Sequence, residues 1–189
     1  DGGIALSADN LGNVYVAGEC YSFSSDYDFV TIKYNFYGSE QWVQRYDGPA
    51  NFDEAMKSIA LDKSENVIIS GESFGIGSKS DFATIKYNSE GVLQWVSRFN
   101  SHANLHDIPS DMKIDTSGNI YVTGESRAAD EMYKVITLKY DKNGVEQWYA
   151  IEDNGNYGIG CSLALDHSGN VYTAGYEFID HYAEMVTLK

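Results

Sequence analysis

The sequence is poor in cysteine and proline and contains no long apolar run. Only 2 of its 189 residues are cysteines, Cys20 and Cys161, and they form no C-x-x-C pair, so neither a disulfide framework nor a structural zinc site is expected. Whole repeats separate the two thiols along the chain, and both are predicted to be free. No apolar stretch approaches the roughly 18 residues that a membrane-spanning helix needs, so membrane insertion is not expected.

Positive charge is also scarce. The chain has 13 Lys and Arg residues against 28 Asp and Glu residues, which gives a formal net charge of −15. Binding to nucleic acid draws much of its affinity from Lys and Arg side chains that displace counterions from phosphates. A chain this acidic repels a phosphate backbone, and no nucleic-acid partner is expected.

Aromatic residues and glycine, in contrast, are abundant. The chain contains 15 Tyr, 8 Phe, 3 Trp and 18 Gly residues but only 2 Pro. This composition is typical of a β-sheet protein with tight turns. At 43% hydrophobic residues the chain is apolar enough for one sizeable core, and a single domain is expected.

Three sequence blocks recur in the same order with a period of about fifty residues. The first block, an Asp followed four residues later by Asn and a β-branched residue, begins at Asp9, Asp62, Asp115 and Asp166. The second block, Thr-Ile/Leu-Lys, begins at Thr31, Thr84, Thr137 and Thr187. The third pairs Gln with Trp42, Trp95 and Trp148. The repeats predicted from these blocks are approximately 1–53, 54–106, 107–157 and an incomplete 158–189.

Each period predicts four β-strands and no helix. In the second repeat the strands are expected at 58–61, 66–71, 81–87 and 94–99, because β-branched and aromatic residues concentrate there between turn residues. The Asp-x-x-Gly-Asn turn joins the first two strands, with glycine in the left-handed conformation that closes a short hairpin. In the second repeat, Glu65 takes the place of this glycine.

Four-stranded antiparallel units of this length usually stack radially into a β-propeller. The predicted fold is therefore an all-β propeller fragment of 15 strands, or about 3.75 blades. Further blades, from the same chain or a second chain, are expected to complete the ring. A self-closed ring of four blades is the alternative.

The second repeat also resembles a known family. It reads Ser-Ile-Ala-Leu-Asp from Ser58, then Asn66-Val67, then Gly-Glu-Ser from Gly71, then Asp-Phe-x-Thr-Ile-Lys-Tyr from Asp81, and it is followed by Trp95. This pattern resembles the bacterial seven-bladed β-propeller (SBBP) repeat family over nearly the whole chain. The resemblance implies a secreted or cell-surface protein, or a periplasmic one, and a non-catalytic role.

The repeated acidic and aromatic residues favour structural roles. Asp9, Asp62, Asp115 and Asp166 are expected to accept backbone N–H groups in Asx turns, because their loops lack the alternating oxygen ligands of a calcium loop. The lysine of each second block, Lys33, Lys86, Lys139 and Lys189, is expected to pair with that aspartate. Trp42, Trp95 and Trp148 are expected to pack between blades. No repeat breaks the pattern with cofactor-binding groups, and no cofactor is expected.

His102 and His106 form an H-x-x-x-H spacing, which binds zinc when both imidazoles share a helix face. No helix is expected in this segment, and its alignment with residues 50–54 marks it as a repeat loop. No metal site is therefore expected. The sequence also contains no Gly-x-Ser-x-Gly motif, and no nucleophile stands beside an evident base, so catalytic residues are not assigned.

The longer connections between strands vary from repeat to repeat and lie at one end of the sheets. Aromatic side chains at loop tips stack on sugars or anchor protein partners, whereas the short turns at the other end are nearly identical. The predicted ligand-binding face comprises Tyr21, Phe23, Tyr27, Phe52, Phe74, His102, His106, Met132 and Tyr133.

These patterns predict a non-catalytic binding or scaffold module for a protein or glycan partner. Two alternatives stay open. One is a propeller enzyme, a lyase or a glycoside-active enzyme, whose catalytic residues lie partly outside this segment. The other is a purely structural spacer in a surface fibre or sheath.

Overall fold

The computed structural model of the chain describes residues 2–23, 26–152, 157–179 and 182–189, which contain 15 β-strands. No helix occurs among these residues, so none of them forms an apolar helix that could cross a membrane. The strands are β1 (Gly2–Ala8), β2 (Val14–Ser22), β3 (Asp26–Tyr34), β4 (Glu40–Tyr46), β5 (Glu54–Leu61), β6 (Val67–Phe74), β7 (Ser80–Tyr87), β8 (Leu93–Phe99), β9 (Asp107–Ile114), β10 (Ile120–Arg127), β11 (Tyr133–Tyr140), β12 (Glu146–Glu152), β13 (Tyr157–Leu165), β14 (Val171–Ile179) and β15 (Tyr182–Leu188).

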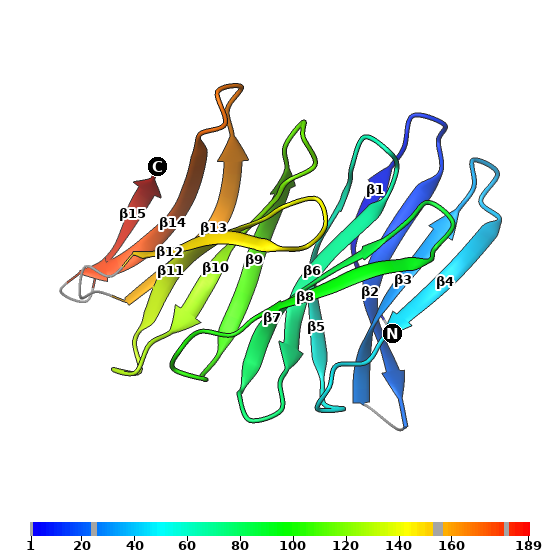
Figure 1. Cartoon of the computed structure of the whole chain (residues 1–189). Helices are drawn as coiled ribbons and strands as arrows, with labels where there is room; N and C mark the ends of the chain where they lie inside the picture. The colour runs from blue at the N-terminus through cyan, green and yellow to red at the C-terminus, as the bar shows by residue number, and fades with distance from the viewer. Residues whose placement is uncertain (1, 24–25, 153–156, 180–181) are drawn as a thin grey trace.

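The strands form four antiparallel sheets, each made of neighbours along the chain. Three sheets have four strands, in the orders β1-β2-β3-β4, β5-β6-β7-β8 and β9-β10-β11-β12, and the fourth is β13-β14-β15. The sheets stand in chain order as an open row, with the two labelled ends of the chain on opposite sides (Figure 1). The all-β fold of antiparallel blades and the count of 15 strands are thus confirmed.

The first strand of the second blade is longer than predicted. In the second blade it begins at Glu54 instead of Ser58. The register shifts between Met56 and Ser58, which is a β-bulge at Lys57. A bulge places two residues opposite one on the partner strand, so the apolar alternation that marks a strand is interrupted there. The fourth blade has the same shift between Gly160 and Ser162.

The Asp-x-x-Gly-Asn turns are hydrogen-bonded Asx turns. Asp9 Oδ1 accepts the backbone N–H groups of Leu11 and Asn13, both at 2.9 Å, and Oδ2 accepts the Asn13 side-chain amide at 2.7 Å. The turns at Asp62, Asp115 and Asp166 repeat these contacts. Hydrogen bonds from Asn170 lower the pKa of Asp166 to about 2, so the carboxylate is charged in neutral solution.

The hydrophobic core lies between the sheets. One cluster joins the first two blades and includes Phe29, Met56 and Ile69, while a second joins the second and third blades and includes Ile68 and Met112. Consecutive strand residues point to opposite faces, so Ile68 and Ile69 serve different clusters. A blade flanked on both sides is therefore apolar on both faces. Both cysteines are free, as predicted.

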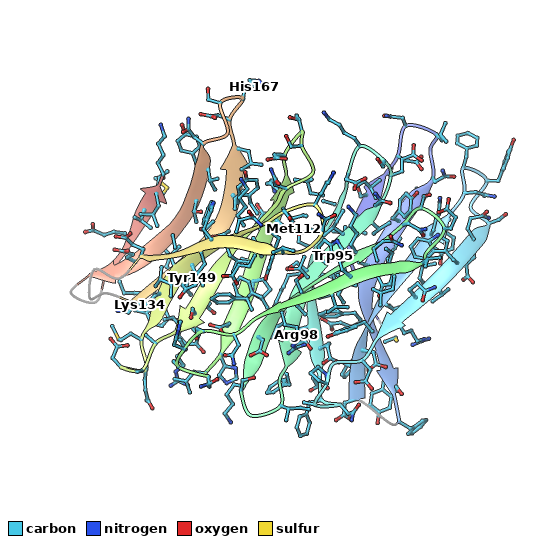
Figure 2. All side chains as sticks on the ribbon, viewed as in Figure 1. Trp95, Arg98, Met112, Lys134, Tyr149 and His167 are labelled. Atoms are coloured by element: carbon cyan, nitrogen blue, oxygen red, sulfur yellow. The ribbon has the colours of Figure 1, made fainter. Side chains whose placement is uncertain are left out.

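Tryptophan side chains join the first sheet to the second and the second sheet to the third. The indole N–H of Trp42 in β4 donates to the Ser89 carbonyl at 3.0 Å, and that of Trp95 in β8 donates to the Lys142 carbonyl at 3.2 Å. Both carbonyls belong to the turn between the third and fourth strands of the following blade. Figure 2 shows Trp95 on β8, toward the end that bears this turn. We call this contact the interblade joint.

The prediction that each repeated lysine pairs with its aspartate is correct only for Lys86, which lies 2.8 Å from Asp62. It is wrong for the other three lysines, which lie over tyrosine rings: Lys33 over Tyr15, Lys139 over Tyr121 and Lys189 over Tyr172. Each of these tyrosines donates its hydroxyl to the turn aspartate. The second blade has Ile68 at that position, so Lys86 reaches the carboxylate instead.

Replacing Glu65 by glycine is expected to stabilise the protein. Glu65 has φ 61° at the turn position where Gly12, Gly118 and Gly169 also have positive φ. A Cβ in this conformation costs roughly 1–2 kcal/mol, so Glu65→Gly is expected to raise the free energy of unfolding by about 1 kcal/mol. Gly169→Ala is the reciprocal control, because only open space surrounds its missing Cβ, and it is expected to lower stability. Urea unfolding that shows Glu65→Gly to be less stable than the parent would contradict this assignment.

Candidate functional site

The two ends of the sheets differ in their connections. One end, which we call the turn face, carries the short hairpin turns such as 9–13 and 35–39. The other end, which we call the variable-loop face, carries the loops 75–79 and 128–132 within blades and the connections 47–53 and 100–106 between blades. Figure 1 shows the two sets of loops at opposite ends of the strands. The connections at 153–156 and 180–181 lie outside the described residues.

A first aromatic cluster on the variable-loop face belongs to the first blade. Tyr21 lies edge-on to Phe23 at 5.5 Å and to Tyr27 at 5.6 Å between ring centroids. Phe23 is 100% exposed and Tyr21 is 49% exposed. The backbone N–H of Tyr27 donates to Asp53, which ties this cluster to the connection between the first two blades. A fully exposed phenylalanine costs solvation free energy and is a common mark of a contact surface.

A second cluster crosses from the first blade to the third. Phe52 lies 5.9 Å from Phe74, and Phe74 lies 6.2 Å from the ring of His106. Phe52 and Phe74 also line an open pocket of about 350 Å³ with Asp26, Asp53 and Lys79. Six of the nine predicted ligand-face residues therefore lie in the first cluster or in and beside this pocket: Tyr21, Phe23, Tyr27, Phe52, Phe74 and His106.

The remaining predicted residues lie farther along the row of blades. Tyr133 packs edge-on against Tyr157 at 5.5 Å, and the Arg127 guanidinium lies over the Tyr133 ring at 5.8 Å. Met132 is half-buried, and its backbone N–H donates to Asp130 within the loop. The nine residues thus form separate groups on one face instead of a single pocket.

Sequence reasoning missed part of the third aromatic group. Tyr157 in β13 and Phe178 in β14 stack edge-on at 5.5 Å, and Tyr176 lies 5.6 Å from Phe178. These residues continue the group that begins at Tyr133. The sequence did carry a sign of this group, because aromatic residues stand at alternate positions of β14. Side chains at alternate positions of a strand point to the same face of the sheet.

His102 and His106 do not share a ligand site. His106 Nδ1 lies 2.7 Å from Ser80 Oγ in the second blade, and its ring packs against Phe74. His102 instead lines a different cavity with Arg127 and Lys134. The Ser80–His106 contact resembles part of a catalytic dyad, but Ser80 is fully buried and offers no accessible nucleophile.

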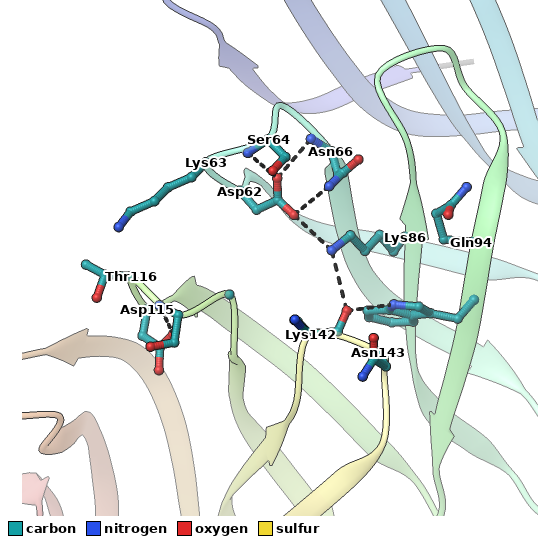
Figure 3. Close-up of a pocket in the computed structure, with 13 residues that line it drawn as sticks. Asp62, Lys63, Ser64, Asn66, Lys86, Gln94, Asp115, Thr116, Lys142 and Asn143 are labelled. Atoms are coloured by element: carbon teal, nitrogen blue, oxygen red, sulfur yellow. Dashed lines mark hydrogen bonds and ion pairs between the residues drawn. The ribbon is translucent and has the colours of Figure 1, made fainter.

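A cavity of about 590 Å³ lies on the turn face between the second and third blades (Figure 3). Asp62, Lys63, Lys86, Trp95 and Lys142 are among the residues that line it. In Figure 3 the Lys86 ammonium bridges the Asp62 carboxylate and the Lys142 carbonyl. The sequence did not predict this cavity, because its lining residues come from four hairpins that belong to two blades.

A buried carboxyl group lies on the second strand of the third blade. Burial and the negative charge of Glu72 raise the pKa of Glu125 to about 7, although the charge of Lys57 opposes this shift. Glu125 Oε2 is buried, and no hydrogen-bond partner is found for it among the described residues. A buried carboxyl group in such surroundings is more stable with its proton than without it.

The sheets and their joints together define the chain as a row of β-propeller blades. Residues 94–130 match the family model of the SBBP β-propeller repeat. The predicted resemblance to this repeat is thereby confirmed.

The chain also resembles one curated protein and several solved structures. An uncharacterized WD repeat-containing protein of Acanthamoeba polyphaga mimivirus is 24% identical over 145 residues, which are 77% of this chain and 8% of that protein. The chain thus spans a small part of that relative's length. An endo-arabinase from Bacteroides thetaiotaomicron has a TM-score of 0.51 at 9% identity, covering 96% of this chain and 72% of the enzyme. The β-propeller domain of the Trilobed protease from Pyrococcus furiosus has a TM-score of 0.46 at 6% identity, covering 97% and 57%. The likeness to the endo-arabinase shows the fold alone.

Glu125→Gln is expected to change how stability depends on pH. Between the ordinary pKa of 4.5 and the folded value of about 7, the folded protein holds the Glu125 proton more tightly than the unfolded chain does. The stability that Glu125 contributes is therefore complete below the unfolded pKa and is lost as pH rises through the folded pKa. Relative to Glu125→Gln, the parent should lose roughly 1–3 kcal/mol between about pH 4.5 and 8.

Urea unfolding across this pH range measures the effect. Glu146→Gln, at an exposed position in β12, serves as the control and is expected to run parallel to the parent. Parallel profiles for Glu125→Gln and the parent would show that Glu125 titrates normally in the folded protein.

Proposed function

We propose that this chain is a non-catalytic β-propeller module that binds a protein or glycan partner through its variable-loop face. The observation that carries the proposal is the set of exposed aromatic side chains on that face, above all Phe23 and Tyr21. Aromatic rings supply contact area to sugars and to protein partners at low cost in side-chain entropy. The turn face, in contrast, repeats the same Asx turn from blade to blade.

Charge narrows the class of partner. A net charge of −15 attracts basic surfaces and repels anionic polymers, and it does not oppose the binding of neutral sugars. Carboxylates such as Asp26 and Asp53 line the pocket that contains Phe52 and Phe74, where they accept hydrogen bonds from sugar hydroxyls or pair with basic side chains. We further propose that the protein acts outside the cytoplasm, at the cell surface or after secretion. The match to the SBBP repeat supports this proposal.

Further blades are also proposed as partners. Trp148 occupies the position of Trp42 and Trp95 in the third blade but is 39% exposed. At the other end of the row, the missing Cβ of Gly38 faces open space, whereas those of Gly91 and Gly144 face tryptophan rings. The two ends therefore present complementary halves of the interblade joint. Another blade, from the same polypeptide or a second chain, fits each half.

The binding proposal is tested on glycan and protein arrays, followed by titration of any ligand found. Phe23→Ala and Tyr21→Ala are expected to weaken binding by about tenfold or more without loss of stability, because both side chains are exposed. Tyr37→Ala is the matched control, since Tyr37 is 87% exposed on the turn face. Lys63→Ala, beside the turn-face cavity, is the second control.

Other outcomes discriminate between the alternatives. Binding that is lost in Tyr37→Ala or Lys63→Ala, and kept in Phe23→Ala, places the site on the turn face and overturns the proposal. Turnover of a polysaccharide on the same arrays identifies a propeller enzyme instead. Absence of binding to every glycan and protein probe favours a structural spacer.

A further inference from the structure

Three carboxylates meet at the boundary between the first two blades. Asp28 lies in β3, Asp47 follows the last residue of β4, and Glu54 is the first residue of β5. One oxygen from each side chain lies within 4.8 Å of the others, and no other set of three or more His, Cys, Asp or Glu side chains is this close among the described residues. Asp28 is 5% exposed and Glu54 is 1% exposed, while Asp47 faces solvent.

Two oxygens of this cluster are buried without a hydrogen-bond partner. Asp28 Oδ1 and Glu54 Oε2 have no partner among the described residues, although Glu54 Oε1 accepts the Ser73 hydroxyl at 3.0 Å. None of the ion pairs found in the described part of the chain includes Asp28, Asp47 or Glu54. A buried carboxylate oxygen that accepts no hydrogen bond and faces no counter-charge destabilises the anion, so the cluster favours a positive charge or a proton.

In each of the next two blades, a positively charged side chain lies at or beside the position equivalent to Asp28. In the second blade, Asp81 replaces Asp28 and pairs with Arg98 at 2.9 Å. In the third blade, the residue equivalent to Asp28 is itself a lysine, Lys134. Figure 2 shows Arg98 and Lys134 toward the same end of their blades.

The first blade lacks this compensation. Arg45 is the equivalent of Arg98 in the first blade, because Arg45 lies opposite Val30 as Arg98 lies opposite Ala83. Arg45 instead donates a hydrogen bond to the sulfur of Cys20. The second blade also lacks the third acid, because Asn100 replaces Asp47. The other acid of that boundary, Asp107, accepts the Ser101 backbone N–H through Oδ2 at 2.7 Å, while its Oδ1 is buried without a hydrogen-bond partner among the described residues. Among the blade boundaries that the structure describes in full, only the one between the first and second blades therefore combines three acidic side chains with no cation paired to any of them.

Burial and, to a smaller extent, neighbouring negative charges favour the protonated forms of Glu54 and Asp47. Burial, together with the charges of Asp47 and Asp28, raises the pKa of Glu54 to about 7. Burial and the charge of Asp28 raise the pKa of Asp47 as well. A proton on Glu54 is thus the alternative to a bound cation for neutralising the cluster. The experiment below distinguishes the proton from the cation.

We propose that Asp28, Asp47 and Glu54 bind a calcium ion that links the first and second blades. Calcium takes carboxylate oxygens at roughly 2.3–2.6 Å, so two oxygens that share one ion can lie almost 5 Å apart. Magnesium demands near-octahedral geometry at about 2.0–2.1 Å and gives up its water reluctantly, so carboxylates contributed by two blades suit calcium better. The exposed Asp47 leaves a path from solvent and room for the water molecules that complete the coordination. The proposal does not depend on the proposed ligand-binding function.

Asp47→Asn is the first variant to test, because its exposed side chain can lose its charge without disturbing the core. Terbium luminescence measures occupation of the site on the intact chain, with displacement by calcium chloride and by magnesium chloride. We expect calcium to displace terbium at a concentration at least tenfold lower than magnesium does. Asp47→Asn is expected to weaken calcium binding at least tenfold.

Thermal unfolding with calcium chloride or EDTA provides the second measurement. Calcium should raise the midpoint of the parent and leave that of Glu54→Gln unchanged. Asp107→Asn, at the matching place between the second and third blades, should keep the full calcium response. A response of equal size in the parent, Asp47→Asn and Glu54→Gln would overturn the proposal. The proposal would also be overturned if the parent gained stability on acidification toward pH 5 but gained none from millimolar calcium. A proton would then occupy the site.

Discussion

The interblade joint is the contact on which the rest of this structure depends. A tryptophan from the fourth strand of one blade donates its indole N–H to a turn carbonyl of the next, and its ring lies against the glycine of that turn. The repeated lysine donates to the same carbonyl, Lys33 to Ser89 and Lys86 to Lys142. Each joint is thus fixed by a hydrogen bond, a ring contact and a cation together.

This joint explains why chemical variety gathers at the opposite end of the sheets. The turn that receives the tryptophan requires a glycine with positive φ and a carbonyl that accepts the indole N–H, so each of these turns keeps its glycine and its length. The loops at the other end receive no tryptophan side chain in the described part of the chain. They carry the aromatic clusters, and the carboxylates Asp28, Asp47 and Glu54 meet there because the joint sets how closely one blade approaches the next.

Much of the fold follows from the sequence, whereas most of the site does not. The period, the four strands of each blade and the turn glycines are local features, and Glu65 takes the predicted left-handed conformation. The pairing of the lysines was mispredicted because it depends on one residue of a neighbouring strand, Tyr15 or Ile68. The acid cluster and the turn-face cavity were not predicted because each brings together residues of two blades, which no motif within one repeat encodes.

The comparison of Gly144→Ala with Gly38→Ala tests the central role of the joint most directly. Both glycines have positive φ, at 80° and 77°, so alanine strains both backbones by roughly 1–2 kcal/mol. A Cβ at Gly144 would approach the Trp95 ring to 2.6 Å, whereas one at Gly38 meets nothing within 4 Å. Urea unfolding should therefore show that Gly144→Ala costs about 1–3 kcal/mol more than Gly38→Ala. Equal losses of stability in the two variants would contradict the account, because the ring contact would then contribute nothing to holding the blades together.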